Sequence, residues 1–487
     1  MTDPRGSNPT IKQDAEAKPH PPRFWWLKRL SLAGLLLIVA LAGLRWWWGH
    51  EAQRRIDALV ADAHAKGEPI LPEDFDSPPV PDDQNAAIPL KQAETMPDLN
   101  APEWAFQRSI SETLPLSTAD ASTLQRILQN HKVELQLLRS ARRLPAAGWR
   151  LQIRSPEIWS RFAYADVRLA LLLRWSVLYE HSRGNDAAAI EYFRDMVTLA
   201  KVCGCRPQAH DAVSISVSRN AIAVALSHHE MAANSIRGLL PSLVINESDS
   251  TASKIPASAE QIRGLIADLV DERHVRDAVV QAFLGKRTGD LISAREIAKD
   301  QISFQPLADL ALPIFELRCV ERAHRASAAI EAAREDDYSH ALSRLPSPER
   351  DEAISSLQWL AHGGQDDRNT ADTPRFQEVY RVIVERRVTA TSLALHLYAR
   401  DHAGKLPETL KELVPRYLPM VPSDPLAPDS RPLGYLPHRD PPVLYSVGFN
   451  GIDDGAPLKS PLNATWNPRD HWTNEEDAVF FIRPSLK

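Results

Sequence analysis

One segment near the N-terminus, residues 24–48 (FWWLKRLSLAGLLLIVALAGLRWWW), sets the strongest limit on how this chain folds. Residues 30–44 carry no charge and are mostly Leu, Ala, Val and Ile. A membrane-spanning helix needs roughly 20 mainly apolar residues, and Trp side chains gather at both membrane interfaces. Because Trp clusters flank this run, the segment predicts a transmembrane anchor. Two alternatives stay open: a buried soluble helix, or a signal peptide cleaved after the sequence Ala40-Leu41-Ala42.

The basic residues predict how this anchor is oriented. Before the apolar run, six Lys and Arg side chains stand against three Asp and Glu, whereas the two kinds balance just after it. Loops rich in Lys and Arg stay in the cytoplasm. We therefore expect a cytoplasmic N-terminus and an exoplasmic body at a cell inner membrane.

Composition limits the remaining possibilities. The chain has 487 residues, of which 44% are hydrophobic and 25% charged, so we expect folded cores rather than general disorder. A net charge of −6 argues against a nucleic-acid partner. The three cysteines, Cys203, Cys205 and Cys319, form no disulfide framework. With 38 Pro and only 19 Gly, the chain favours helices broken by Pro-bearing connections.

The order of these patterns predicts a mainly α protein with a small C-terminal α+β module. Helical spacing after the anchor ends at Gly67, proline recurs over 67–116, and helix patterns dominate beyond. The expected parts are a disordered cytoplasmic tail (1–23), the anchor (24–48), a juxtamembrane helix (49–66), a Pro-rich linker or packed strap (67–116), a helical domain (117–372) and the C-terminal module (373–487).

Within the helical domain, one helix pair is the clearest local prediction. Apolar spacing indicates helices over about 156–181 and 188–200, with a turn at Gly184 and Asn185. The pair resembles a single tetratricopeptide-type hairpin, without a clear repeat at a fixed period. Further helices are expected at about 208–240, 258–286, 313–335 and 347–362.

The C-terminal module carries several motifs in a fixed order. A long helix pattern from Pro374 ends before Gly404-Lys405-Leu406-Pro407, and an Asp424-Pro425 turn follows. Then come a Tyr-bearing hairpin pattern around 432–448, the acidic loop 450–455 (NGIDDG) and a strand-like run at 479–482. Over about residues 376–457 this order resembles the C-terminal half of type II secretion major pseudopilins. It resembles more closely membrane-anchored bacterial proteins with large helical insertions.

The resemblance implies a fold and a metal, but not assembly into a pilus. Pseudopilins place their transmembrane segment directly before the long helix, whereas residues 49–372 intervene here, and the prepilin-peptidase pattern is missing. The acidic loop of such pseudopilins binds calcium, which implies Asp453 and Asp454 as ligands and Asp477 as a weaker candidate. Adjacent carboxylates on a Gly-rich loop suit a hard cation. The alternative is a polar hairpin turn, where Asn, Asp and Gly are also favoured.

No motif in the sequence specifies a reaction. His228-His229-Glu230 lacks the second histidine four residues on that a zinc protease helix requires, and no nucleophile elbow or phosphate loop is present. We therefore expect a structural or protein-interaction role in the bacterial envelope, with protein partners there. Two alternatives remain open: a hydrolase whose site lies between the helical domain and the C-terminal module, and a component associated with a secretion system.

Overall fold

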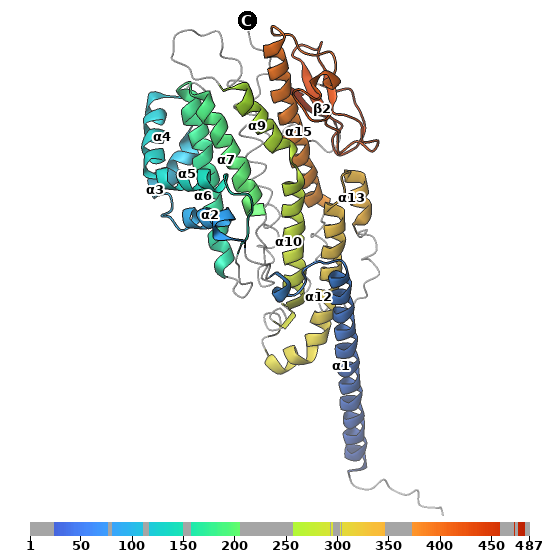
Figure 1. Ribbon diagram of the computed structural model, residues 1–487. Coiled ribbons are helices and arrows are strands. Elements are labelled where there is room, and N and C mark those ends of the chain that lie inside the picture. Colours follow the sequence, from blue (N-terminus) through green and yellow to red (C-terminus); the bar gives the residue numbers. More distant parts are fainter. Residues whose placement is uncertain are drawn as a thin grey trace, which may run out of the picture.

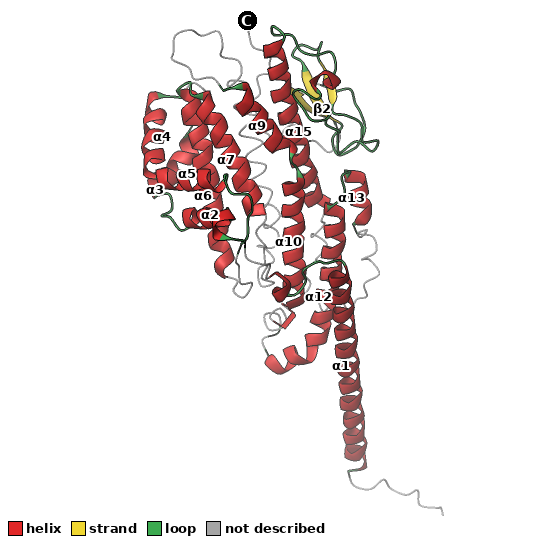
Figure 2. Cartoon of the chain, in the orientation of Figure 1, coloured by secondary structure: helices red, strands yellow, loops and turns green. Residues whose placement is uncertain are grey.

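The computed structural model describes residues 24–75, 80–110, 116–149, 157–204, 257–292, 294–295, 302, 304–345, 373–457, 472 and 476–482. It is mainly helical, with three short strands (Figures 1 and 2). The described helices are α1 (Trp25–Ala65), α2 (Ala87–Glu94), α3 (Ala101–Ser109), α4 (Thr118–Asn130), α5 (Lys132–Ala141), α6 (Glu157–Ser182), α7 (Asp186–Gly204), α9 (Ala259–Val270), α10 (Arg273–Ile292), α12 (Gln305–Ala333), α13 (Tyr338–Arg344) and α15 (Thr373–Asp401). Short 3-10 helices are η1 (Pro72–Phe75), η2 (Asp82–Gln84) and η5 (Leu410–Leu413), and the strands are β1 (Gly434–Leu436), β2 (Val443–Ser446) and β3 (Ala478–Phe481).

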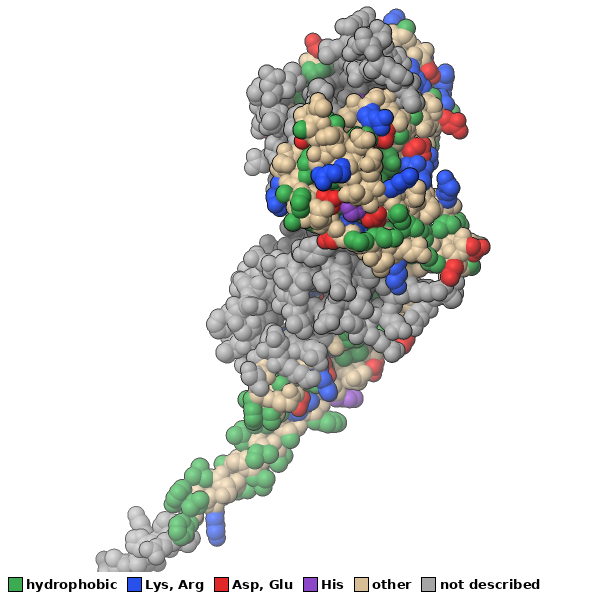
Figure 3. Space-filling view, turned by 90° about the vertical axis from the view of Figure 1, so that its left-hand side faces the viewer, with side chains coloured by type: hydrophobic (Ala, Val, Ile, Leu, Met, Phe, Trp, Pro, Cys, Tyr) green, Lys and Arg blue, Asp and Glu red, His purple; other side chains and the backbone are tan. Residues whose placement is uncertain are grey.

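Helix α1 is one unbroken helix of 41 residues, so the predicted continuation of the anchor beyond Trp48 is confirmed. Its N-terminal half projects from the body (Figure 1), and hydrophobic side chains cover it (Figure 3). Leu35 and Ile38 are 57% and 65% exposed. Helix α1 is long and apolar enough to cross a membrane, and none of the residues in its apolar 18-residue stretch is buried.

The C-terminal half of α1 packs into the body instead. Leu59 and Ala63 form a small buried cluster with Ile70 and with Ala323 of α12. The helix ends at Ala65, two residues before Gly67, whose φ of +70° suits a residue without a Cβ, and the Glu68 amide donates back to the Ala63 carbonyl at 2.9 Å. Beyond this cap, Glu68 is buried. The apolar anchor and the folded body therefore share one helix.

The described residues of the Pro-rich stretch lie on the helical body as a strap. Leu90 and Ala93 of α2 belong to the main buried cluster. Asn85 joins the strap to the chain after α5: its side-chain oxygen accepts from the Gly148 amide at 2.9 Å, and its side-chain nitrogen donates to the Gly148 carbonyl at 2.8 Å. The same oxygen accepts from the amide of Ala87, at the start of α2, at 3.0 Å.

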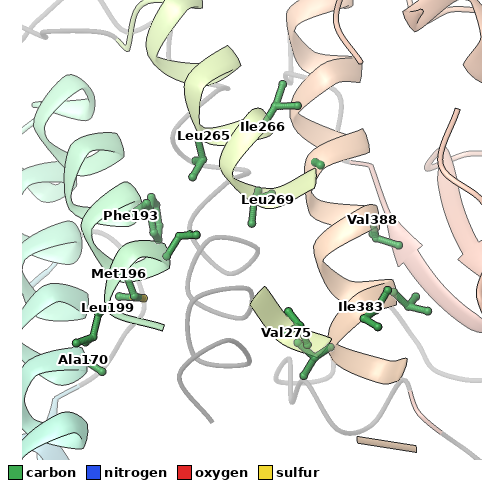
Figure 4. Close-up of a cluster of buried hydrophobic side chains, with 14 of the residues drawn as sticks. Ala170, Phe193, Met196, Leu199, Leu265, Ile266, Leu269, Val275, Ile383 and Val388 are labelled. Carbon is green, nitrogen blue, oxygen red and sulfur yellow. The ribbon is translucent and has the colours of Figure 1, made fainter. Parts of the chain in front are cut away.

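The predicted helix pair is confirmed as α6 and α7, with Gly184 in the turn at a φ of +73°. Helix α7 packs against α9, and α9 packs in turn against α15. Figure 4 shows this contact: Phe193 and Met196 of α7 lie on one side of Leu265 and Leu269, and Ile383 and Val388 of α15 lie on the other. All six side chains are buried in one cluster, which extends from Ala86 to Ile482. The cluster contains residues from both sides of the predicted domain boundary at residue 373. The division into domains there stays a prediction.

Two helices differ from their predicted bounds. The helix expected over 258–286 is two helices, α9 and α10, with a break at Asp271 and Glu272. The helix expected from Pro313 begins eight residues earlier, at Gln305, so that Pro313 lies inside α12. The helices predicted over 208–240 and 347–362, the tail 1–23, Cys205 and the His228-His229-Glu230 segment lie outside the described residues.

The C-terminal residues form a small antiparallel sheet beside α15, in the order β1-β2-β3. Leu444 of β2 pairs with Tyr435 of β1 and with Phe480 of β3. The long helix, the hairpin and the last strand therefore occur in the predicted order, and β3 matches the strand expected around residue 479.

Candidate functional site

The acidic loop Asn450–Gly455 connects β2 to the segment before β3. It starts beyond Gly448, where the backbone has a φ of +69° and where an added Cβ would lie 2.3 Å from the Glu476 carbonyl oxygen. Only glycine fits this close approach. The loop is thereby held against Asp477, and the three carboxylates that the sequence singled out, Asp453, Asp454 and Asp477, are brought to one end of the sheet.

Asp453 and Asp477 already have protein partners. Arg431 Nη1 donates to Asp453 Oδ2 at 2.8 Å, and the Gly455 amide donates to Asp453 Oδ1 at 3.0 Å. Asp477 accepts from the amides of Asp454 and Ala456 at 3.1 and 2.7 Å. Burial raises the pKa of Asp477, although these two hydrogen bonds oppose that rise. Asp477 thus fixes the loop to the start of β3.

These contacts bear on the calcium prediction without deciding it. Asp454 is exposed, whereas Asp453 forms an ion pair with the Arg431 guanidinium. In the part of the chain that the structure describes, no group of three or more His, Cys, Asp or Glu side chains is arranged to hold a metal. Calcium at Asp453 and Asp454 stays a prediction, and Arg431 is the cation that it would have to displace.

Replacing Arg431 by alanine is expected to strengthen calcium binding, because the guanidinium competes for Asp453. Two unit charges 4 Å apart interact by about 1 kcal/mol in water, so the dissociation constant should fall roughly fivefold. The measurement is a calcium titration followed by thermal melting of the full chain in detergent. Asp453→Ala/Asp454→Ala, made in both backgrounds, should abolish the response. Equal behaviour of all four proteins would reduce the loop to a polar hairpin turn.

A second polar cluster lies where α15 meets the break between α9 and α10. Arg387 of α15 donates to both Glu272 carboxylate oxygens at 2.7 Å, and it also donates to the Ser423 carbonyl at 2.8 Å. Burial disfavours its charged form, but the Glu272 carboxylate raises the pKa of Arg387 overall. The pair ties the break between α9 and α10 to the chain before Asp424.

Asp424 organises the same region from the other side. Its carboxylate is buried and accepts from the Val447 amide at 2.8 Å, the Leu426 amide at 3.1 Å and the Ser446 hydroxyl at 2.8 Å. Burial raises the pKa of Asp424, against these hydrogen bonds. The predicted Asp424-Pro425 turn is therefore hydrogen-bonded to the end of β2. These polar groups are engaged in holding the fold, and the hydrolase hypothesis stays a prediction.

Several buried polar groups were not found from the sequence. Arg386 of α15 and Arg168 of α6 are each 1% exposed and donate to backbone carbonyls of distant segments. His131 lies between Glu134 (2.8 Å) and Glu103 (3.4 Å), all three buried. Apart from His131 and Glu134, which are three residues apart, these partners are separated in sequence by 28 to 118 residues, so no local pattern predicts the contacts.

Comparison with known proteins gives no further guide to function. No family model matches the chain, and neither the curated proteins nor the solved structures contain a match.

Proposed function

We propose that this protein is a single-pass membrane protein whose body acts as a structural or protein-interaction module on the exoplasmic side of a bacterial inner membrane. The observation that carries the proposal is the continuity of α1, which is apolar and exposed over its first half and packed into the body over its second. At roughly 1.5 Å per residue, residues 25–48 extend over about 36 Å, enough to cross a bilayer core of about 30 Å with a Trp cluster at each interface.

The rigidity of this connection supports a structural role. A flexible linker would let the body sample many orientations, whereas a continuous helix holds it at a fixed height. The Glu68–Arg287 ion pair, at 2.7 Å, locks the end of α1 to α10. The body therefore presents the same surface to its partners at the same distance from the membrane.

The C-terminal module is proposed to be pseudopilin-like in fold. Its support is the order of elements: the long helix α15, the turn at Gly404 and Pro407, the Asp424-Pro425 turn, the β1–β2 hairpin, the acidic loop and β3. Because α15 is buried against α9, the module is fused to the helical body in a way that a free pseudopilin subunit is not. We propose that α1 holds this module at a fixed distance from the membrane, where protein partners can bind it.

Anchoring and orientation are tested together in cells. The full chain is expected to stay in the membrane pellet after alkaline carbonate extraction. Replacing Leu36 and Ile38 by arginine should release it, because each arginine at the centre of a span costs about 2.5–3.5 kcal/mol. Arginine at the exposed positions Gln53 and Asp57, which lie beyond the apolar half of α1, is the matched control.

The orientation is read with reporters fused after Lys487. Alkaline phosphatase should be active there, because it folds only outside the cytoplasm, and green fluorescent protein exported by the same route should be dark. A fluorescent C-terminal fusion would place the body in the cytoplasm and contradict the proposed orientation.

A further inference from the structure

The first turns of α12 expose an apolar face. Phe304, Leu307 and Leu310 are 61%, 52% and 48% exposed, and their spacing of three residues places them along one side of the helix. The opposite side is fixed, because Leu312 is buried in a small cluster with Phe315 and Cys319. Three large apolar side chains side by side are a feature of interaction surfaces.

This segment lies beside a specific part of α1. Arg45 Nη2 donates to the Asp309 carbonyl oxygen at 3.0 Å. One turn further along α1, a Cβ added at Gly49 would lie 3.9 Å from Pro313 Cγ. The neighbouring Trp46 and Trp47 are 72% and 56% exposed. The apolar face of α12 therefore sits at the height of the Trp cluster that ends the apolar half of α1.

The shape of α12 fits this height. In Figure 1 its first turns, drawn in yellow, bend away from the axis of α1, while the rest of the helix runs alongside it. Pro313 lies inside α12, eight residues after its first residue, and an internal proline removes a helical hydrogen bond and kinks a helix. The first turns thus lie across the direction of the anchor, as a helix in the plane of a membrane surface would.

We propose that residues 304–312 form an interfacial helix that inserts Phe304, Leu307 and Leu310 into the outer part of the leaflet on the side of the body, where α1 emerges from the membrane. The inference rests on the proposed membrane anchor, in which the uncharged run 30–44 crosses the bilayer core and residues 45–48 lie at the interface on the side of the body. An amphipathic segment with its apolar face at this boundary lies in the membrane rather than across it.

The chemistry of the segment selects the acyl region of the lipid rather than charged headgroups. Asp309 is the only charged residue between Ile302 and Phe315, so the segment has no basic face for anionic lipids. Insertion should therefore be the same in neutral and anionic vesicles. Together with α1 it provides a second membrane contact, which fixes how the body is rotated about the anchor.

The test uses spin labels on the full chain in phosphatidylcholine vesicles, with the three native cysteines replaced by alanine. One cysteine at a time is introduced at Leu307 or Leu310, at Ile38 in the anchor, or at Val133, which is 51% exposed on α5. Each nitroxide is then tested for collision with oxygen, which dissolves in lipid, and with a nickel chelate, which stays in water. Circular dichroism confirms that each variant is folded.

We expect the oxygen-to-nickel collision ratio at residues 307 and 310 to be several-fold above that at residue 133, with no change when phosphatidylglycerol is added. A low ratio at 307 and 310 with a high ratio at 38 overturns the interfacial helix and leaves the anchor intact. A low ratio at 38 as well overturns the anchor itself. If both probes are excluded at 307 and 310, protein rather than lipid covers this face, which also overturns the proposal.

Discussion

Replacing Glu68 by glutamine is expected to lower the free energy of unfolding by about 3–5 kcal/mol, the usual cost of removing one partner of a buried ion pair. Glu68 Oε2 accepts from Arg287 Nη1 at 2.7 Å, and its other carboxylate oxygen lies 2.7 Å from Arg334. Arg287 is 1% exposed, so it would keep its charge in the interior without the carboxylate that compensates it. Guanidinium unfolding of the purified protein in detergent, followed by circular dichroism, measures the effect.

The same ion pair predicts a pH dependence. Burial disfavours the charged form of Glu68, but Arg287 and Arg334 outweigh it and hold the pKa below the usual value of 4.5. A carboxylate with a lowered pKa stabilises the folded state fully above its unfolded pKa, and it loses this contribution as the pH falls through the folded pKa. The difference in stability between the natural protein and Glu68→Gln should therefore be constant above about pH 5 and shrink below about pH 4.

Glu73→Gln is the matched control, because Glu73 is exposed in η1 only five residues away. Its free energy of unfolding should stay within about 0.5 kcal/mol of that of the natural protein. If Glu68→Gln behaves like Glu73→Gln, the ion pair does not lock α1 to the body. The rigid tether would then depend on the cluster of Leu59, Ala63, Ile70 and Ala323 and on the other contacts of α1 with α12, such as the Arg45–Asp309 hydrogen bond.

The sequence predicted those helices whose start or end is marked by a residue close to the apolar pattern. The apolar run and Gly67 defined α1, and Gly184 marked the turn between α6 and α7. Ser117 caps α4 in the same local way, because its hydroxyl accepts from the Asp120 amide at 3.0 Å. In each case the residue that ends or starts the helix is next to the apolar pattern that it interrupts.

Tertiary contacts decided the elements that the sequence misplaced. The pattern over 258–286 continues through Asp271, so nothing local shows that α9 stops there; the stop depends on Arg386, which lies more than a hundred residues later. The start of α12 was misplaced because proline is common in the first turn of a helix. Here Pro313 is internal, and the turn before it is held by Arg45 and by the cluster around Leu312.

For the acidic loop, the sequence predicted which carboxylates come together but not what they contact. The sequence placed Asp453 and Asp454 on one loop and suggested Asp477 beside them, and the structure brings the three to the same end of the sheet. It did not suggest Arg431, because an arginine 22 positions before Asp453 is paired with it only by the β1–β2 hairpin. A competing cation of this kind depends on strand register, which local composition does not encode.

Replacing Arg386 by methionine is expected to lower the free energy of unfolding by roughly 3–5 kcal/mol. Its guanidinium donates to the carbonyls of Asp268 (2.8 Å), Leu269 (3.1 Å) and Asp271 (3.1 Å), which are the unsatisfied acceptors at the end of α9. Each hydrogen bond to a charged group contributes about 1.5–3 kcal/mol, and relief of the cost of burying the charge offsets part of the loss. Burial lowers the pKa of Arg386, and the nearby carboxylates of Glu272, Asp271 and Asp268 oppose that shift.

Two further variants distinguish the effect of losing the hydrogen bonds of Arg386 to the end of α9 from the effect of losing a positive charge. Arg400→Met removes an exposed arginine from the same helix and should leave the unfolding midpoint almost unchanged. Arg386→Lys keeps the charge but lacks the planar fork that reaches three carbonyls, so its midpoint should fall between the other two. If the lysine variant is as stable as the natural protein, charge at the end of α9 is sufficient. If the methionine variant is as stable, α9 ends without help from α15, and the contact between the two helices depends on the apolar cluster that contains Leu269 and Ile383.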